Sequence, residues 1–235
     1  MSQILIFGSS GLIGTDLLTL ASRSKAITSI TTANRSEMTW PAEVEVSGKA
    51  TEKIIDFQNL ESWDALFQVD YVFCCLGTTM KIAGSKEQFC QVDYELPVRI
   101  ARLAADNTVK SLVVVSALGA DPESSIFYNQ TKGRMERDIL AINKQLKVTF
   151  LRPSLLIGPR KEFRPGEKIA EQLFKYTSFA FMGPLKKYAP NHSHDVAAVM
   201  LNLALGKIKS SSPFIEADEI SQLAAGISES NPAKR

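Results

Sequence analysis

The stretch "QILIFGSSGLIGTDLL", residues 3–18, joins a short apolar run to a helical pattern through Gly8, Gly11 and Gly14. Glycine destabilises the interior of helices and strands, so three glycines at one junction indicate a special backbone. The run before them is typical of a buried strand, and the leucines after them recur at helical spacing. A strand, a glycine turn and a helix in this order predict a dinucleotide-binding βα unit. The alternative is a tight turn without a ligand.

Strand and helix patterns alternate through two-thirds of the chain. Helical patterns occur at residues 85–107 and 125–143, and the apolar or β-branched runs that predict five more strands are residues 26–35, 51–57, 69–77, 110–119 and 146–154. Alternation of this kind is typical of βαβ units. The sequence therefore predicts an α/β fold with a Rossmann-type, doubly wound parallel sheet.

The pattern changes after Arg152. A loop rich in proline, glycine and arginine precedes helical patterns at residues 169–181 and 193–205, and a short strand is expected within 211–220. This part is too interrupted to form a separate domain. We expect residues 1–235 to form one domain, with residues 153–235 contributing most of a small C-terminal cap on the substrate side.

Composition narrows the class of protein. The net charge of +2 argues against a general nucleic-acid-binding coat, and no run approaches the ~18 apolar residues of a membrane span. Cys74, Cys75 and Cys90 form neither a disulfide framework nor a zinc pattern and fit a reducing compartment. No signal peptide is visible. We expect a cytoplasmic protein with a small-molecule substrate and no nucleic-acid or membrane partner. A monomer or homodimer, and a protein partner, are both compatible.

Each glycine has an expected role. Gly8 allows the sharp turn, Gly11 lets the backbone approach a pyrophosphate, and Gly14 lets the helix pack against the strand. The helix start at Leu12 and Ile13 offers free N–H groups to phosphate, and the Ser10 hydroxyl adds a donor.

The end of the second predicted strand indicates the cofactor. NAD enzymes usually place an acid there, whereas this chain has Arg35. A guanidinium pairs bidentately with phosphate. We therefore expect NADP rather than NAD, and the alternative is a surface arginine. At the end of the fourth strand, the backbone at Leu76 and Gly77 and the hydroxyls of Thr78 and Thr79 are expected near the ribose or nicotinamide.

The segment "YNQTK" places Tyr128 and Lys132 one helical turn apart. A nearby ammonium favours the phenolate, so the tyrosine could exchange a proton near neutral pH. Ser116, at the end of the fifth strand, is the expected hydrogen-bond donor to a substrate carbonyl, and Ser124 and Ser125 compete for this role. The alternative for the helix pair is an ordinary exposed contact.

These motifs resemble the short-chain dehydrogenase/reductase superfamily. The segments "CCLGTT", "VSALGAD", "YNQTKGRME" and "LRPSLLIGPRKEFRPGE" narrow the resemblance to its atypical Tat-interacting-protein group. The resemblance implies the fold and bound NADP. It also implies adenine contacts from Asp56 and Phe57, a contact from Lys132 to the nicotinamide ribose, and cofactor contacts from Tyr128 and Pro153.

Two further clusters have open interpretations. Arg160, Lys161 and Arg164, with Lys186 and Lys187, suit either a pocket for an acidic substrate or a solvated basic loop. In "NHSHD", residues 191–195, the histidine spacing does not suit a metal, and a helix cap at Ser193 explains the segment better.

The function expected from the sequence is an NADP-dependent oxidoreductase that acts on a carbonyl or alcohol through Ser116, Tyr128 and Lys132. The alternative is an NADP(H)-bound regulatory or protein-interaction protein with little turnover.

Overall fold

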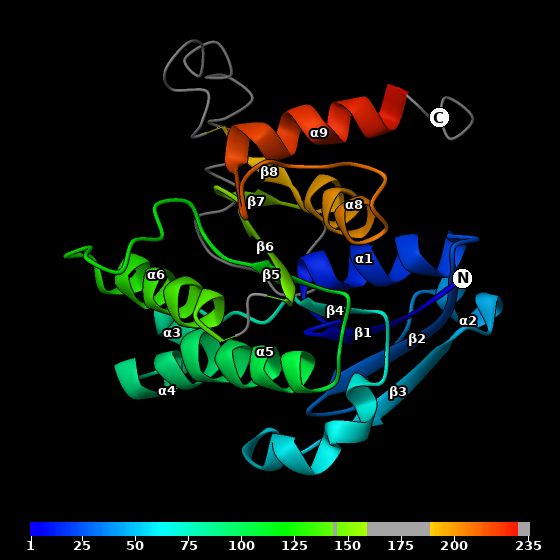
Figure 1. Ribbon diagram of the computed structural model, residues 1–235, viewed down its shortest axis with the longest axis horizontal. Helices are drawn as coiled ribbons and strands as arrows, with labels where there is room; N and C mark the ends of the chain where they lie inside the picture. Colours follow the sequence, from blue (N-terminus) through cyan, green and yellow to red (C-terminus); the bar gives the residue numbers. More distant parts are fainter. Residues whose placement is uncertain (143–144, 159–188, 230–235) are drawn as a thin grey trace.

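Seven parallel strands form the central sheet of the computed structural model, which describes residues 1–142, 145–158 and 189–229 (Figure 1). The strand order is β3-β2-β1-β4-β5-β6-β9. The strands are β1 (Ser2–Phe7), β2 (Ile27–Asn34), β3 (Ala50–Ile54), β4 (Tyr71–Cys74), β5 (Ser111–Val115), β6 (Lys147–Arg152) and β9 (Phe214–Glu216). The predicted α/β, doubly wound parallel sheet is confirmed.

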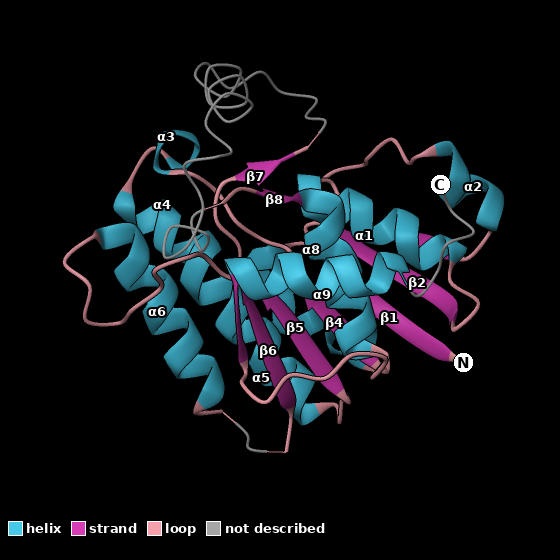
Figure 2. Ribbon diagram, turned by 90° about the horizontal axis from the view of Figure 1, so that it is seen from above, coloured by secondary structure: helices cyan, strands magenta, loops and turns pink. Residues whose placement is uncertain are grey.

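Helices cover both faces of this sheet (Figures 1 and 2). One face carries α1 (Leu12–Arg23), α8 (Ser193–Ala204) and α9 (Ala217–Glu229), with α2 (Ala42–Ser47) beside α1. The other carries the 3₁₀ segment η1 (Phe57–Phe67), α5 (Leu96–Asp106) and α6 (Phe127–Leu140), with α3 (Met80–Ala83) and α4 (Lys86–Cys90) nearby. A two-stranded ladder joins β7 (Leu156–Ile157) to β8 (Asn191–His192).

The strand side chains divide between two apolar cores. Ile4 and Ile6 of β1 belong to the core under α1 and α8, whereas Leu5 and Phe7 belong to the core under α5 and α6. All four are fully buried. Successive side chains of a strand point to opposite faces, so a strand covered on both sides must be apolar throughout.

The direction in which successive strands are added to the sheet reverses between β1 and β4. The chain runs outward from β1 to β2 and β3, then returns to pair β4 on the other side of β1. In open α/β sheets, ligands bind at this switch point, outside the carboxyl ends of the strands. The glycine turn follows β1, and Cys75, Leu76 and Gly77 follow β4, so both segments lie at this place.

One long helical segment contains a π turn. Ser85 caps its start by accepting a hydrogen bond from the Gln88 N–H, as residue types at that position predict. Between α4 and α5 lies the π turn η2 (Gln91–Glu95), where the N–H of Leu96 donates to the Gln91 carbonyl. Pro97 follows directly and cannot donate a backbone hydrogen bond. The wider turn accommodates it, so the predicted helix continues with a local change of pitch.

The C-terminal part differs from the expected arrangement. Phe214–Glu216 forms β9, so the expected short strand is confirmed, but it extends the main sheet beside β6. Helices α8 and α9 complete one layer of the fold rather than covering the carboxyl edge. Residues 159–188, which belong to the cap expected from residues 153–235, lie outside the described residues. The single-domain assignment stays a prediction.

Candidate functional site

The glycine turn has two kinds of glycine. Gly8 has a φ of +77°, and an added Cβ would lie 2.7 Å from the Cys75 carbonyl oxygen. At Gly14 an added Cβ would lie 2.1 Å from the Gly8 carbonyl oxygen. Gly11 differs, because its nearest neighbour would be that same oxygen at 3.3 Å. The fold therefore requires Gly8 and Gly14, whereas Gly11 leaves space for a group outside the turn.

The start of α1 is open to that space. Gly11 is the N-cap residue, with extended backbone angles (φ −77°, ψ 171°) and no side-chain cap. Ser10 and Gly11 are exposed, Leu12 is half-buried and Ile13 is buried. An exposed helix N-terminus without a capping side chain offers N–H groups and the positive end of the helix dipole to an anion.

Beneath the turn, a polar network ties β1 to β2 and β3. The buried Ser9 hydroxyl donates to Asn34 Oδ1 at 2.8 Å, and Asn34 Nδ2 donates to Glu52 Oε1 at 2.7 Å. Arg35 follows Asn34, is exposed, and has no hydrogen bond or ion pair within the described residues. The structure therefore leaves the Arg35 guanidinium available, although Glu52 brings a carboxylate to the same end of the sheet.

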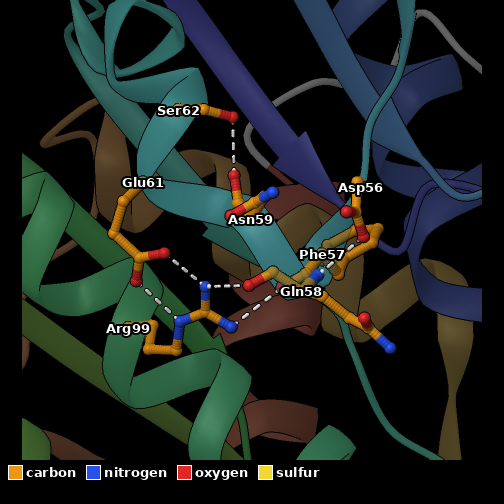
Figure 3. A network of polar contacts seen from close by, with 7 residues as sticks. All are labelled: Asp56, Phe57, Gln58, Asn59, Glu61, Ser62 and Arg99. Carbon is orange, nitrogen blue, oxygen red and sulfur yellow. Dashed lines mark hydrogen bonds and ion pairs between the residues drawn. The ribbon is translucent and has the colours of Figure 1, made fainter.

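The loop after β3 is held by Arg99 of α5 (Figure 3). Arg99 donates to the Phe57 carbonyl at 2.8 Å and the Gln58 carbonyl at 3.1 Å, and it binds the Glu61 carboxylate with two nitrogens. The Arg99 hydrogen bond lowers the pKa of Glu61 to about 2. Asp56 caps η1 by accepting the Gln58 N–H at 2.9 Å. Asp56 and Phe57, expected near the adenine, thus lie at the start of η1, which Arg99 holds in place.

The loop after β4 contains the other predicted cofactor residues. Gly77 is exposed, and Leu76 is half-buried. Thr79 Oγ1 accepts the Ile82 N–H at 3.3 Å and so caps α3. The Thr78 N–H donates to Asp93 Oδ2 at 2.8 Å. The backbone at this end of β4 is therefore set by Asp93, a residue of the π turn.

Ser116 has a buried hydroxyl without a hydrogen-bond partner in the described part of the chain. Its N–H donates to the Leu151 carbonyl at 2.7 Å, which continues the β5–β6 ladder. Buried hydroxyls normally have a partner, so a hydroxyl in this state at a strand's carboxyl end is suited to bind a ligand. Ser124 instead accepts the Ile126 N–H at 3.2 Å, which leaves Ser116 the better candidate. The carbonyl of buried Pro153 accepts the Leu118 N–H at 3.0 Å and anchors the following loop.

Tyr128 and Lys132 lie one turn apart at the start of α6, but in different surroundings. Tyr128 is 36% exposed, and its ring centroid lies 5.6 Å from that of Phe89. Lys132 is 2% exposed. Gly133 allows this packing, because an added Cβ would lie 2.1 Å from the Asp121 carbonyl carbon. The loop between β5 and α6 therefore packs directly on the helix.

Lys132 forms a buried ion pair with Asp93. The ammonium nitrogen lies 2.7 Å from Asp93 Oδ1, and the two side chains are 3% and 1% exposed. Burial alone would lower the pKa of Lys132, but the charges of Asp93 and Tyr128 and the hydrogen bond to Asp93 outweigh it and raise that pKa. Asp93 was not among the predicted site residues. Its helical segment also contains Glu87 and Glu95, so no local pattern distinguished Asp93 from a solvent-facing acid.

The remaining predictions have separate outcomes. The basic residues Arg160, Lys161, Arg164, Lys186 and Lys187 lie outside the described residues. Ser193 is not the cap of α8, because His192 occupies the N-cap position and the Ser193 hydroxyl donates to Asp16 Oδ2 at 2.5 Å. The hydroxyl therefore binds a residue of α1, which packs against α8, and does not cap its own helix. Within the described ranges, no three histidine, cysteine or acidic side chains form a group that could hold a metal ion.

Comparison with known proteins identifies the family. The HIM1 family model matches residues 32–182. A Candida albicans relative, "Protein FMP52, mitochondrial", is 33% identical over 229 residues, which cover 93% of this chain and 96% of the relative. Rattus norvegicus "Protein HTATIP2" is 33% identical over 173 residues, covering 73% and 70% respectively. The expected resemblance to the Tat-interacting-protein group is confirmed.

Solved structures share the fold at low identity. The UDP-Glc/GlcNAc 4-epimerase of Campylobacter jejuni has a TM-score of 0.65 at 13% identity and covers 100% of this chain and 85% of its own. MoeE5, solved with UDP-glucuronic acid and NAD, has a TM-score of 0.67 at 17% identity, with 97% and 82% covered. These likenesses confirm the Rossmann-type fold.

The relatives overturn the predicted cytoplasmic location. FMP52 proteins of several yeasts, including those of Candida albicans and Eremothecium gossypii, match over 93% of this chain and are named mitochondrial. The absence of a recognisable leader pattern was therefore a poor guide. Separately, no helix in the described residues is long and apolar enough to span a bilayer.

The family match and the relatives agree over most of the chain. The family model spans well over half of it, and the FMP52 relatives extend the likeness to nearly its full length. The helix bearing Tyr128 and Lys132 lies within residues 32–182, which the family model matches. The chain therefore belongs to the HIM1 family, with the FMP52 and HTATIP2 proteins as relatives and a Rossmann-type fold as its framework.

Proposed function

We propose that this protein is an NADP-dependent oxidoreductase acting on a carbonyl or alcohol of a small molecule. The observation that carries the proposal is the buried Ser116 hydroxyl, which has no hydrogen-bond partner among the described residues. Ser116 directly follows β5, and a loop then leads to α6, the helix with Tyr128 and Lys132. A hydroxyl in this state is suited to hold an oxygen of a bound ligand.

The residues at the switch point fit a dinucleotide. The space beside Gly11 and the uncapped start of α1 suit a pyrophosphate. Arg35 is exposed and has no partner in the part of the chain that the structure describes, and it suits the 2′-phosphate of NADP. The start of η1 at Asp56 and Phe57 suits the adenine, and the exposed backbone at Gly77 suits the nicotinamide half. Two of the solved neighbours, MoeE5 and the UDP-glucuronic acid 4-epimerase of Bacillus cereus, were solved with NAD, so the preference for NADP rests on Arg35 alone.

The chemistry needs three roles from the chain. Ser116 would donate a hydrogen bond to the substrate oxygen and hold it beside the phenol. Tyr128 would give that oxygen its proton, and its partial exposure allows the proton to be replaced from solvent. Lys132 would favour the phenolate and bind the nicotinamide ribose. The cofactor, when bound, supplies or accepts the hydride.

A second candidate has its own observation. The Lys132 ammonium is held in a buried ion pair with Asp93, so its charge does not serve Tyr128 alone. A protein that binds NADP(H) and acts through a protein partner needs no lysine dedicated to proton transfer. This is the regulatory reading, with little turnover.

The test separates binding from turnover. NADPH and NADH are titrated by calorimetry, and NADPH consumption is then followed with a panel of aldehydes, ketones and quinones. The oxidoreductase proposal expects NADPH binding and turnover that Ser116→Ala abolishes while NADPH binding survives. Binding without turnover on the panel favours the regulatory candidate, and absence of NADPH and NADH binding refutes both.

A further inference from the structure

Asp93 connects two parts of the candidate site that are far apart in sequence. Its Oδ1 lies 2.7 Å from the Lys132 ammonium of α6, and its Oδ2 accepts the Thr78 N–H of the β4 loop at 2.8 Å. An added Cβ at Gly77 would lie 3.5 Å from Oδ1, so this exposed backbone runs along the carboxylate. One carboxylate therefore holds both a side chain and a backbone group expected on the nicotinamide side.

The π turn explains how the carboxylate reaches this position. Asp93 is the middle residue of η2, which lies between α4 and α5 and packs against α6. A π turn carries an extra residue and so rotates the side chains that it contains relative to a regular helix, and such turns often mark functional sites. Pro97, which cannot donate to the carbonyl of Asp93, makes the wider turn favourable.

Burial makes the pairing of charges obligatory. Both side chains are at least 97% buried, and a lone charge in such a place is strongly disfavoured. Among the described residues, the other titratable groups that act on the pair are Tyr128 of α6 and Cys74 of β4. Burial raises the pKa of the Cys74 thiol to about 11, so this thiol stays neutral at physiological pH. Asp93 is therefore the anion that keeps Lys132 charged.

We propose that Asp93 is a positioning residue that keeps the Lys132 ammonium charged and aligned with the β4 loop, so that both bind the nicotinamide half of the cofactor. This inference rests on the proposed cofactor binding and adds a residue that the Ser-Tyr-Lys assignment does not contain. It predicts that loss of the carboxylate weakens the binding of the nicotinamide half of the dinucleotide and not that of the adenosine half.

The experiment uses three ligands and the variant Asp93→Asn. The amide oxygen can still accept the Thr78 N–H, but the charge is lost. Dissociation constants are measured from pH 7 to 9.5 for NADPH, for reduced nicotinamide mononucleotide and for 2′,5′-ADP. In wild type the NADPH affinity should vary little with pH, because Lys132 stays protonated. In Asp93→Asn it should fall at least about tenfold between these pH values, because burial without a counter-ion lets Lys132 lose its proton.

Matched variants distinguish an effect of Asp93 on cofactor binding from an effect on folding stability. Glu136→Gln breaks another buried ion pair of α6, that with Arg152, in which Glu136 is 2% exposed. It should lower the melting temperature without adding a pH slope to NADPH affinity. In the Lys132→Met background, the further substitution Asp93→Asn should not make NADPH affinity more dependent on pH. Repeating the series in Tyr128→Phe excludes the phenol as the titrating group.

The outcomes are distinct. If wild type binds neither NADPH nor the mononucleotide, the proposed function fails. If wild type binds both, two results refute the role of Asp93. One is an Asp93→Asn variant whose NADPH affinity depends on pH no more than that of wild type. The other is a variant that binds 2′,5′-ADP and the mononucleotide with equal losses of affinity. Should Asp93→Asn not fold, Asp93→Glu keeps the charge and moves it by one methylene. It should weaken the mononucleotide at every pH and leave 2′,5′-ADP unchanged, and unchanged mononucleotide affinity would overturn the proposal.

Discussion

Replacing Gly11 with valine should separate the cofactor role of the glycine turn from its structural role. The φ of −77° at Gly11 is open to any residue, and the nearest atom to an added Cβ is the Gly8 carbonyl oxygen at 3.3 Å. Valine adopts this extended conformation readily. We therefore expect the free energy of unfolding to change by no more than about 1 kcal/mol.

The effect on binding should be much larger. A side chain at Gly11 would occupy the space in front of the α1 N-terminus, where a pyrophosphate would accept backbone N–H groups. A hydrogen bond to a charged group contributes about 1.5–3 kcal/mol. Loss of two such bonds corresponds to about 3–6 kcal/mol, which raises the NADPH dissociation constant roughly 10²- to 10⁴-fold.

The assay is a calorimetric NADPH titration beside a thermal melt, with Gly14→Ala as the matched control. At Gly14 an added Cβ would lie 2.1 Å from the Gly8 carbonyl oxygen, so that variant should lose stability first. A folded Gly11→Val protein that binds NADPH with the wild-type dissociation constant would refute the reasoning, and the turn would then have a structural role only.

Four further predictions concern residues around the site. Arg35→Ala should weaken NADPH binding about 10- to 100-fold and leave NADH nearly unchanged, as one lost charged contact implies; equal losses in calorimetry would contradict the 2′-phosphate assignment. Arg99→Ala frees the Phe57 carbonyl and should weaken 2′,5′-ADP about tenfold but not reduced nicotinamide mononucleotide. Because Arg99 lowers the pKa of Glu61 from 4.5 to about 2, the stability that this contact provides is present above pH 4.5 and is lost as pH falls toward 2. Melting curves should show this acid-dependent loss in wild type and not in Arg99→Ala. Tyr128→Phe should keep NADPH binding and lower turnover on an identified substrate by about 10²-fold or more; full activity would assign the proton to another group.

Local patterns were sufficient for the main elements. The strands that precede Gly8 and Gly77 were predicted because residues buried on both faces must be apolar throughout. The cap at Ser85 follows from its residue type at the start of the helical pattern, because its hydroxyl acts within three residues. The Tat-interacting-protein likeness was also readable, because its motifs are contiguous. In each case the determining interactions are close in sequence.

Tertiary structure decided what depends on distant partners. Ser193 has a residue type suited to an N-cap, yet its hydroxyl bonds Asp16, 177 residues away. Short segment 214–216 became the seventh strand of the sheet because β6 had a free edge beside it. Only the fold shows that Asp93 meets both Lys132 and Thr78. The sequence alone determined which residues carry chemical groups and which local turns they favour. Which of those groups become neighbours in the interior, where burial makes their pairing obligatory, was decided by the packing of helices onto the sheet.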